Sequence, residues 1–427
     1  MFSRLQWLML QLSRQLWVRA TAFSVLGVVT ALIALWVKRY IPDELPAKIG
    51  SDAVDSLLQI IATSMLSVMI FSLSTIVSAY ASATSNTTPR ATQLLMTDST
   101  AQNALATFLG AFLFSLVGII FLQTGQYGDS GRVVLYAVTL GVIAIIVLTL
   151  LRWTDYVLRL GRVGPTCDRV EAAATTAIRR RRASPYLSGH PREAGDSGIP
   201  NAALSIHTDT FGYVEHIDMQ ALQDAASEAE IEIYLVALPG HFAGAAQPLV
   251  SVMRMPSADC IEAIRRAFSI AAARSFDQDP RFGVCVLSEI ASRALSPAVN
   301  DPGTAIDILS RGARMLSLWS DNHPALIEAE AENVRFPNVH VPPVELDELF
   351  DDFFIPIARD GAGLVEVGIH LQKMLQTLAC LGDHRYRKSA ARHSAQALAR
   401  ARLALTLTDD IVRVEQAAAR VAKAAAD

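Results

Sequence analysis

The segment LLQIIATSMLSVMIFSLSTIVSAY, residues 57–80, decides the fold class of this chain. It lies within 34 consecutive uncharged residues between Asp55 and Arg90. A helix rises about 1.5 Å per residue, so about 20 apolar residues cross a hydrocarbon core about 30 Å thick. The sequence therefore predicts a transmembrane helix here.

Three further uncharged stretches predict transmembrane helices. They comprise 18 residues between Arg19 and Lys38, 30 between Asp98 and Asp129, and 19 between Arg132 and Arg152. Residues 2–17 carry apolar side chains near one helical face and two tryptophans, which favours an interfacial helix ahead of the first span. We therefore expect a four-span membrane domain over residues 1–160.

Charge is distributed unevenly along the 427 residues. Residues 1–160 hold 10 Lys and Arg and 7 Asp and Glu, which leaves 27 and 34 for residues 161–427. The second part is therefore predicted to be globular and mildly acidic. The four cysteines are far apart and form no Cys-x-x-Cys pair, so they indicate a reducing compartment and neither a disulfide framework nor a zinc site.

Arginines near the span ends predict the orientation. Residues 152–182 carry eight arginines and three acids, and Arg4, Arg14 and Arg19 precede the first span. Since cytoplasmic segments keep the positive charge, we expect an inner-membrane protein with both termini in the cytoplasm. Arg179, Arg180, Arg181 and Arg182 are candidates for contact with anionic lipid headgroups. Nucleic acid is not an expected partner.

The second span is unusually rich in hydroxyl side chains. Ser67, Ser74 and Ser78 fall on one helical stripe, with Ser64 at its upper end. Small hydroxyl residues at this spacing allow close helix packing. They could instead line a path for water or ions along the axis of a homo-oligomer, which makes these four serines the candidate pore-lining residues.

The globular part is predicted to have an α+β fold in three pieces. Residues 161–201 read as a basic juxtamembrane segment and a linker, because residues 183–201 are rich in Gly, Pro and Ser. Residues 202–256 alternate as strands do and resemble a barrel-sandwich hairpin. The carrier domains of that type use a lysine, which this stretch lacks, so the likeness is architectural only. Residues 257–427 form the helical remainder.

Helix start signals divide this remainder. Ser257 or Asp259 can cap a helix that we expect to run to Ser275, and a second is expected over residues 282–295. Asn300 or Asp301 can cap a third, with Pro302 at its first position. Further helices are expected over residues 345–359, 363–381 and 385–426. Five acids among three phenylalanines at 345–359 are predicted to face a basic surface, with Arg179–Arg182 as one candidate.

Three sequence pieces resemble a known family. They are SFDQDPRFGVCVLSEIASRALSPAVNDPGTA at residues 275–305, GYVEHID at 212–218, and SVMIFSLSTIV in the second span. Together they resemble the bacterial predicted membrane proteins of domain-of-unknown-function family 2254, although Ala298 stands where glycine is expected. The resemblance implies four spans followed by a cytoplasmic domain, and it implies no activity.

Motifs for catalysis are missing, so we expect neither an enzyme nor a cofactor. No lysine occurs between Lys48 and Lys373, which excludes a phosphate loop from that region. Three histidines and two aspartates in residues 207–241 could be gathered as a metal site, but scattered surface positions are the favoured interpretation, so no metal is expected. Two capped helix starts could bind a small ligand or ion of unknown identity, which makes Gln278, Asp279, Arg293, Asn300 and Asp301 candidate ligand residues.

These observations favour a homo-oligomeric inner-membrane pore or channel-like protein with a cytoplasmic sensing domain. The alternative is a membrane-tethered scaffold or regulatory module that neither conducts nor catalyses. Conductance of the purified protein distinguishes the two hypotheses.

Overall fold

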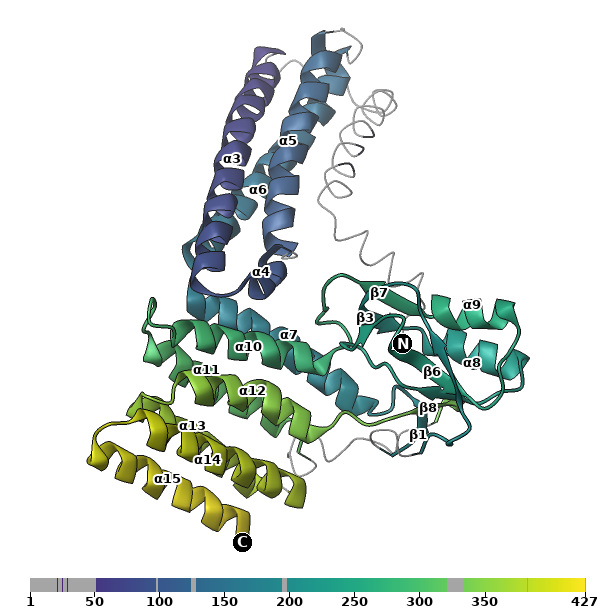
Figure 1. Cartoon of the computed structure of the whole chain (residues 1–427). Coiled ribbons are helices and arrows are strands. Elements are labelled where there is room, and N and C mark those ends of the chain that lie inside the picture. The colour runs from purple at the N-terminus through teal and green to yellow at the C-terminus, as the bar shows by residue number, and fades with distance from the viewer. Residues whose placement is uncertain are drawn as a thin grey trace. The chain divides into compact units, whose positions relative to one another are not determined.

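A computed structural model describes residues 51–96, 99–123, 128–193, 198–320, 334–381 and 383–426, together with Thr21, Val25 and Val29. The chain divides into two compact units, which we describe separately (Figure 1). One unit covers residues 5–85 and 92–166 and contains the long apolar helices. The other covers residues 1–4, 86–91 and 167–427 and is globular.

The described part of the membrane unit contains three long helices, labelled α3, α5 and α6 in Figure 1. Within the described residues these helices are long and apolar enough to cross a membrane, over residues 53–85, 99–123 and 133–159. They coincide with the second, third and fourth predicted spans. The first predicted span and the N-terminal interfacial helix lie outside the described residues. The bounds are α3 Ser51–Asn86, α5 Ser99–Gln123 and α6 Gly128–Arg159, and the short helix α4, Pro89–Met96, follows α3.

Apolar side chains at helical spacing hold this unit together. Leu58 of α3 is fully buried and packs against Gly118 of α5. A Cβ at Gly118 would lie only 2.9 Å from the Leu58 side chain, so glycine makes room for this contact. Phe108 of α5 is also fully buried in the core, and Trp153 of α6 stacks on Tyr156 with ring centroids 5.4 Å apart. Close packing of this kind is what holds membrane helices together.

The described residues of the globular unit form two β-sheets. The first has five strands in the order β1-β8-β4-β6-β2, and the second has three in the order β5-β3-β7. β8 pairs in parallel with both β1 and β4, whereas the other pairings are antiparallel. The strands are β1 Gly189–Pro191, β2 Leu204–His207, β3 Gly212–Ile217, β4 Ile233–Leu235, β5 Phe242–Ala243, β6 Pro248–Val252, β7 Phe268–Ala271 and β8 Phe336–Val341.

The strands differ from the prediction in three ways. The barrel-sandwich hairpin is not confirmed, because β5 and β6 join different sheets. β1 lies in the predicted linker and pairs with β8, so part of that segment belongs to the sheet. The helix expected to reach Ser275 ends at Arg266, because residues 268–271 form β7 and pair with β3.

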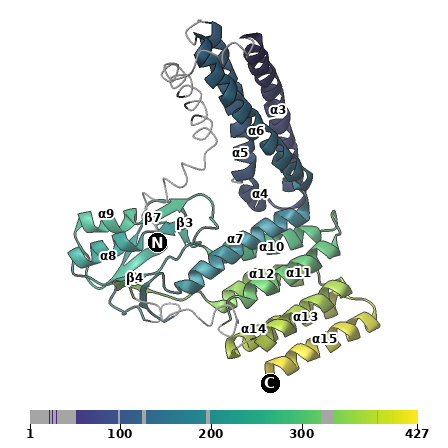
Figure 2. The same cartoon turned by 180° about the vertical axis from the view of Figure 1, so that it is seen from behind.

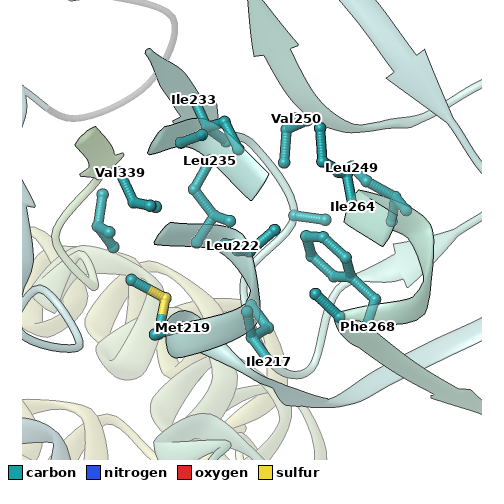
Figure 3. Close-up of a cluster of buried hydrophobic side chains, with 14 of the residues drawn as sticks. Ile217, Met219, Leu222, Ile233, Leu235, Leu249, Val250, Ile264, Phe268 and Val339 are labelled. Carbon is teal, nitrogen blue, oxygen red and sulfur yellow. The ribbon is translucent and has the colours of Figure 1, made fainter. Parts of the chain in front are cut away.

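Two helices cover the sheets and complete one apolar core. They are α8, Met219–Glu228, capped by Asp218, and α9, Ala258–Arg266, capped by Ser257, which was one of its two predicted cap candidates. Figure 3 shows Leu222 of α8 among side chains from β4, β6 and β8. Burial of these aliphatic side chains is the main stabilising contribution to this region.

The remaining helices stack as a helical layer in Figures 1 and 2. α7 crosses α10 where Gly283 meets Ala174, and a Cβ at Gly283 would collide with Ala174. The predicted helix over 385–426 is broken into two at residues 405–407, and α13, α14 and α15 pack against one another. The bounds are α7 Val163–Ala183, α10 Pro280–Ala294, α11 Pro302–Ser317, α12 Leu346–Asp360, α13 Val365–Leu381, α14 His384–Ala404 and α15 Thr408–Ala426.

Candidate functional site

The serine stripe lies on the side of α3 opposite its packed side. Ser72 is fully buried, whereas Ser74, two residues further along, is exposed. Two residues correspond to roughly 200° around a helix of 3.6 residues per turn. Ser67 and Ser78 share the exposed side with Ser74, while Ser64 is half-buried. The structure therefore brings three of the four pore candidates onto one open face.

Three of the four candidate hydroxyl groups donate hydrogen bonds to carbonyl groups of their own helix. Ser64 donates to the carbonyl of Ile60 at 2.6 Å, and Ser67 donates to that of Thr63 at 3.1 Å. Ser74 donates to the carbonyl of Ile70 at 3.0 Å. These bonds satisfy the donors, and the hydroxyl oxygens still have lone pairs that can accept a bond.

A hollow of about 420 Å³ lies at the end of this stripe within the membrane unit. Gly161 lines this hollow and has a φ of +79°. A Cβ at Gly161 would lie 3.2 Å from the carbonyl oxygen of Ala79, so the two backbone segments approach closely. Four of its eight lining residues carry hydroxyls, and the lining is Ser74, Thr75, Ser78, Ala79, Ser82, Val157, Leu160 and Gly161.

Two of the ligand candidates occupy structural positions at the start of α10. Asp279 is 2% exposed and caps the helix by accepting from the N–H groups of Arg281 and Phe282. Its other oxygen lies 2.7 Å from the guanidinium of Arg274. Gln278 accepts a hydrogen bond from the backbone N–H of Ile217. These contacts fasten α10 to the three-stranded sheet.

The other three candidates lie at the far end of α10. The N–H of Asp301 donates to the carbonyl of Ala294, the last residue of that helix. Arg293 is exposed on its last turn, and Asn300 has a left-handed φ of 50°. A helix of 15 residues is about 22 Å long. The structure therefore does not bring these five candidate residues together at one place.

Asp301 itself is the N-cap of α11, as predicted, and accepts from the backbone N–H of Thr304 at 3.0 Å. The hydroxyl and the backbone N–H of Thr304 lower the pKa of this carboxyl below its ordinary value. Glu289, four residues before Arg293 on α10, is bound by Arg90 at 2.9 Å.

The acidic-aromatic helix α12 pairs with basic side chains of the same chain. Arg281 of α10 contacts Asp352 at 2.7 Å and Glu348 at 2.5 Å. Arg392 of α14 lies 2.9 Å from Asp351. Burial would lower the pKa of the Arg281 guanidinium, but the two carboxylates raise it well above its usual range. A basic partner was therefore predicted correctly, but Arg281 and Arg392 take the place proposed for Arg179–Arg182.

These arginines were not among the candidate residues. Arg281 lies 67 and 71 residues from the two carboxylates that it binds, and Arg274 lies five residues from Asp279. Helical periodicity therefore gave no signal for either arginine. The nearby thiol of Cys285 is buried, which raises its pKa to about 12 and leaves it a protonated thiol at neutral pH. This cluster is therefore better suited to packing than to nucleophilic chemistry.

A second hollow, of about 580 Å³, lies between α10 and α12. Its acids already have cationic partners, namely Arg90 for Glu289, Arg392 for Asp351 and Arg281 for Asp352. The hollow therefore has no excess of unpaired negative charge that would select a cation. Its lining is Cys285, Ser288, Glu289, Ser292, Asp351, Asp352, Ile355, Pro356 and Arg359.

The four arginines at the end of α7 do not share one environment. Arg181 is 3% exposed, and Arg182 donates to the carbonyl of Leu318. Arg179 and Arg180 are exposed. Of the four, only Arg179 and Arg180 have the exposure that a contact with lipid headgroups would require.

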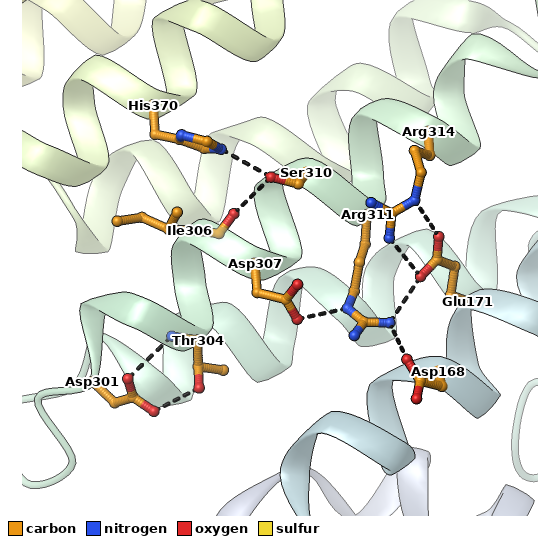
Figure 4. Close-up of polar contacts among 10 residues, drawn as sticks. All are labelled: Asp168, Glu171, Asp301, Thr304, Ile306, Asp307, Ser310, Arg311, Arg314 and His370. Atoms are coloured by element: carbon orange, nitrogen blue, oxygen red, sulfur yellow. Dashed lines mark hydrogen bonds and ion pairs between the residues drawn. The ribbon is translucent and has the colours of Figure 1, made fainter.

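The acidic residues of α7 are bound to α11. Figure 4 shows Arg311 between Asp168, at 2.6 Å, and Glu171, at 2.8 Å. Arg314 binds the same Glu171 at 2.9 Å. The guanidinium of Arg311 is largely buried, so this network fixes the register of α7 on α11.

The histidines considered as metal ligands are divided between elements. His207 lies on β2 of the larger sheet, and His216 lies on β3 of the smaller sheet. No group of three or more His, Cys, Asp or Glu side chains suited to a metal occurs in the part of the chain that the structure describes.

Comparison with known proteins identifies the family. The model of the predicted membrane proteins DUF2254 matches residues 13–377. The chain belongs to this family. Uncharacterized proteins of Mycobacterium tuberculosis and Mycobacterium bovis are 24% identical to it over 236 residues, which is 53% of this chain and 45% of each mycobacterial chain. The match thus spans less than half of those relatives. No solved structure matches this DUF2254 protein.

Proposed function

We propose that this DUF2254 protein is a homo-oligomeric pore or channel-like protein of the inner membrane, lined by α3 and regulated by its globular unit. The observation that carries the proposal is the exposed stripe of Ser67, Ser74 and Ser78 opposite the packed side of α3. In a single subunit this stripe would face lipid, which cannot bond to the free lone pairs of the hydroxyls. A second subunit, or water along the axis of an oligomer, can donate hydrogen bonds to these lone pairs.

The side chains around the stripe add to the argument. Phe71 lies between Ser67 and Ser74 on the same face, at spacings of four and three residues, and is 70% exposed. In a water-filled axis an aromatic ring at this position would form a hydrophobic constriction. Such constrictions gate by losing their water.

A non-conducting scaffold is the second candidate. It is favoured by the hydrogen bonds of Ser64, Ser67 and Ser74 to their own helix, since satisfied donors need no water or ions. In that case small side chains would serve only close helix contact between subunits.

Planar-bilayer recording of the purified full chain tests the proposal. We expect single-channel conductance that falls strongly in Ser67→Trp and Ser74→Trp. Ala144→Trp is the matched control, because Ala144 is an exposed small residue of α6, away from the stripe. An oligomer that does not conduct would support the scaffold. An equal loss of conductance in Ala144→Trp would show that α3 does not line the conducting path.

A further inference from the structure

The exposed face of α7 carries positive charge without matching acids. Between Gly161 and Ser184 the chain has two acids, Asp168 and Glu171. Both are bound by Arg311, and Glu171 is also bound by Arg314 (Figure 4). The acids of α7 are therefore neutralised from within the globular unit.

The arginines of α7 separate into buried and exposed groups. Arg181 and Arg182 are directed into the fold, where Arg182 reaches the carbonyl of Leu318. Arg162, Arg179 and Arg180 are exposed, and no ion pair to these three side chains occurs among the described residues. The exposed side of α7 therefore carries cations, whereas its two acids are paired with arginines of α11.

We propose that Arg179 and Arg180 form a docking surface for the anionic headgroups of the bilayer in which the chain itself is embedded. Two observations support a lipid occupant. The surface is cationic and carries no exposed unpaired acid, so it complements a phosphodiester. The helix that carries it, α7, also follows α6, a candidate membrane helix, after a connection of three residues, Leu160–Arg162. This inference does not depend on the proposed pore.

The chemistry of the contact is electrostatic and bidentate. A guanidinium presents paired N–H donors that match two oxygens of a phosphate, which favours arginine over lysine at such surfaces. Each arginine close to an anionic leaflet is expected to strengthen the association roughly fivefold. Because the surface is open to solvent, salt at about 1 M, with a Debye length of about 3 Å, should suppress it.

A fluorophore on Thr176→Cys reports on this face, because Thr176 is exposed and lies three and four residues before Arg179 and Arg180. The full chain carries Cys380→Ser to remove its exposed native cysteine, and the same background without Thr176→Cys measures residual labelling. It is reconstituted in nanodiscs of phosphatidylcholine, with or without phosphatidylglycerol. Energy transfer to a headgroup-labelled lipid is the measurement.

We expect transfer to rise when phosphatidylglycerol is present, and the rise to disappear at high salt and in Arg179→Gln/Arg180→Gln. Arg420→Gln/Lys423→Gln, which removes two exposed cations of α15, is the matched control and should keep the rise. Absence of a rise in the parent protein, or equal loss in the control, overturns the proposal. If phosphatidylglycerol gives no rise but inorganic phosphate changes the emission of the fluorophore itself in phosphatidylcholine discs, the surface is a soluble anion site instead. Duplex DNA binding that is lost in the double variant would assign a nucleic-acid surface.

Discussion

Arg90 and Glu289 meet across 199 residues of sequence, with Nη1 of Arg90 lying 2.9 Å from each carboxylate oxygen of Glu289. Residues 86–91, which directly follow α3, belong to the globular unit through contacts of this kind. The chain that leaves the serine-rich helix is therefore held by α10. The link between α10 and the segment after α3 is thus this ion pair, followed by the few backbone residues between Arg90 and the end of α3.

The strength of this ion pair is predicted to be small. The two side chains are 57% and 35% exposed, and exposed pairs contribute about 0.2–1 kcal/mol. A double-mutant cycle of Arg90→Ala and Glu289→Ala, followed by chemical unfolding of the globular unit, should give a coupling energy in that range that decreases with salt. A coupling that exceeds about 1 kcal/mol and resists high salt would contradict this prediction.

Gly240→Ala is predicted to be strongly destabilising. Gly240 has a φ of +93°, and a Cβ there would collide with the carboxylate of Asp279. That carboxylate cannot move away freely, because it is buried, caps α10 and binds Arg274. Strained backbone and overpacking together should cost more than about 2 kcal/mol in free energy of unfolding.

Gly363→Ala is the matched control for Gly240→Ala. Gly363 does not have a left-handed φ, and a Cβ there would meet nothing within 4 Å. Alanine should leave the free energy of unfolding unchanged or raise it by about 0.4–1 kcal/mol, since it restricts the unfolded chain. If both variants lose stability equally in chemical unfolding, the contact between Gly240 and Asp279 is not the cause.

The Asp301 cap should be separable from its charge. Asp301→Ala removes the oxygen that accepts from the N–H of Thr304 and should cost about 0.5–2 kcal/mol in free energy of unfolding. Asp301→Asn keeps a capping oxygen and should cost less. Thermal unfolding of the two variants at neutral pH checks this order. If Asn is as harmful as Ala, or folds fully but loses conductance, the charge itself has a function.

The pH dependence gives this cap a second signature. The folded pKa of Asp301 is below its ordinary value of 3.8, chiefly through the hydroxyl of Thr304. The unfolded state therefore binds the proton more tightly, so the stabilisation is complete above that ordinary pKa and is lost as the pH falls through the folded pKa. Stability should thus fall less steeply in acid for Asp301→Asn than for the parent protein. Identical acid profiles would show that the charged form is not favoured.

Local signals in the sequence predicted those parts of the fold that depend on neighbours in the chain. The sequence predicted Ser257 or Asp259 as one cap and Asn300 or Asp301 as another, and in each pair one residue, Ser257 or Asp301, accepts the expected backbone hydrogen bond. Long apolar runs likewise predicted α3, α5 and α6. These features depend on hydrogen bonds and apolar surface within about one turn or one element.

Contacts between distant residues could not be predicted in the same way. Residues 268–271 continue the preceding helical pattern, and they form β7 only because β3 offers a partner more than 50 residues earlier. The separation of the ligand candidates was missed for a related reason. Asp279 and Asp301 look alike as caps, yet α10 itself separates them, and the sequence contains no signal for the direction in which the second turn folds back.

Both termini are predicted to lie in the cytoplasm, and thiol labelling of intact cells checks this orientation. Ala53→Cys lies at the start of a candidate span, on the side predicted to be periplasmic, whereas Leu403→Cys lies on α14 and replaces a side chain that is 90% exposed. In a Cys380→Ser background, an impermeant reagent should label Ala53→Cys before permeabilisation and Leu403→Cys only afterwards. Early labelling of Leu403→Cys would reverse the assigned topology.

Phe71 is predicted to limit conductance if α3 lines a pore. Its ring lies on the face of Ser67 and Ser74 and is 70% exposed in the subunit. A ring of such side chains around an axis would exclude water, so Phe71→Ala should raise conductance or open probability several-fold, and Phe71→Ser should do so more strongly. Leu148→Ala is the matched control, because Leu148 is a large, 57% exposed side chain of α6. Recordings in which Phe71→Ala and Leu148→Ala behave alike, or in which Phe71→Ser lowers conductance, would place Phe71 against lipid and remove α3 from the pore.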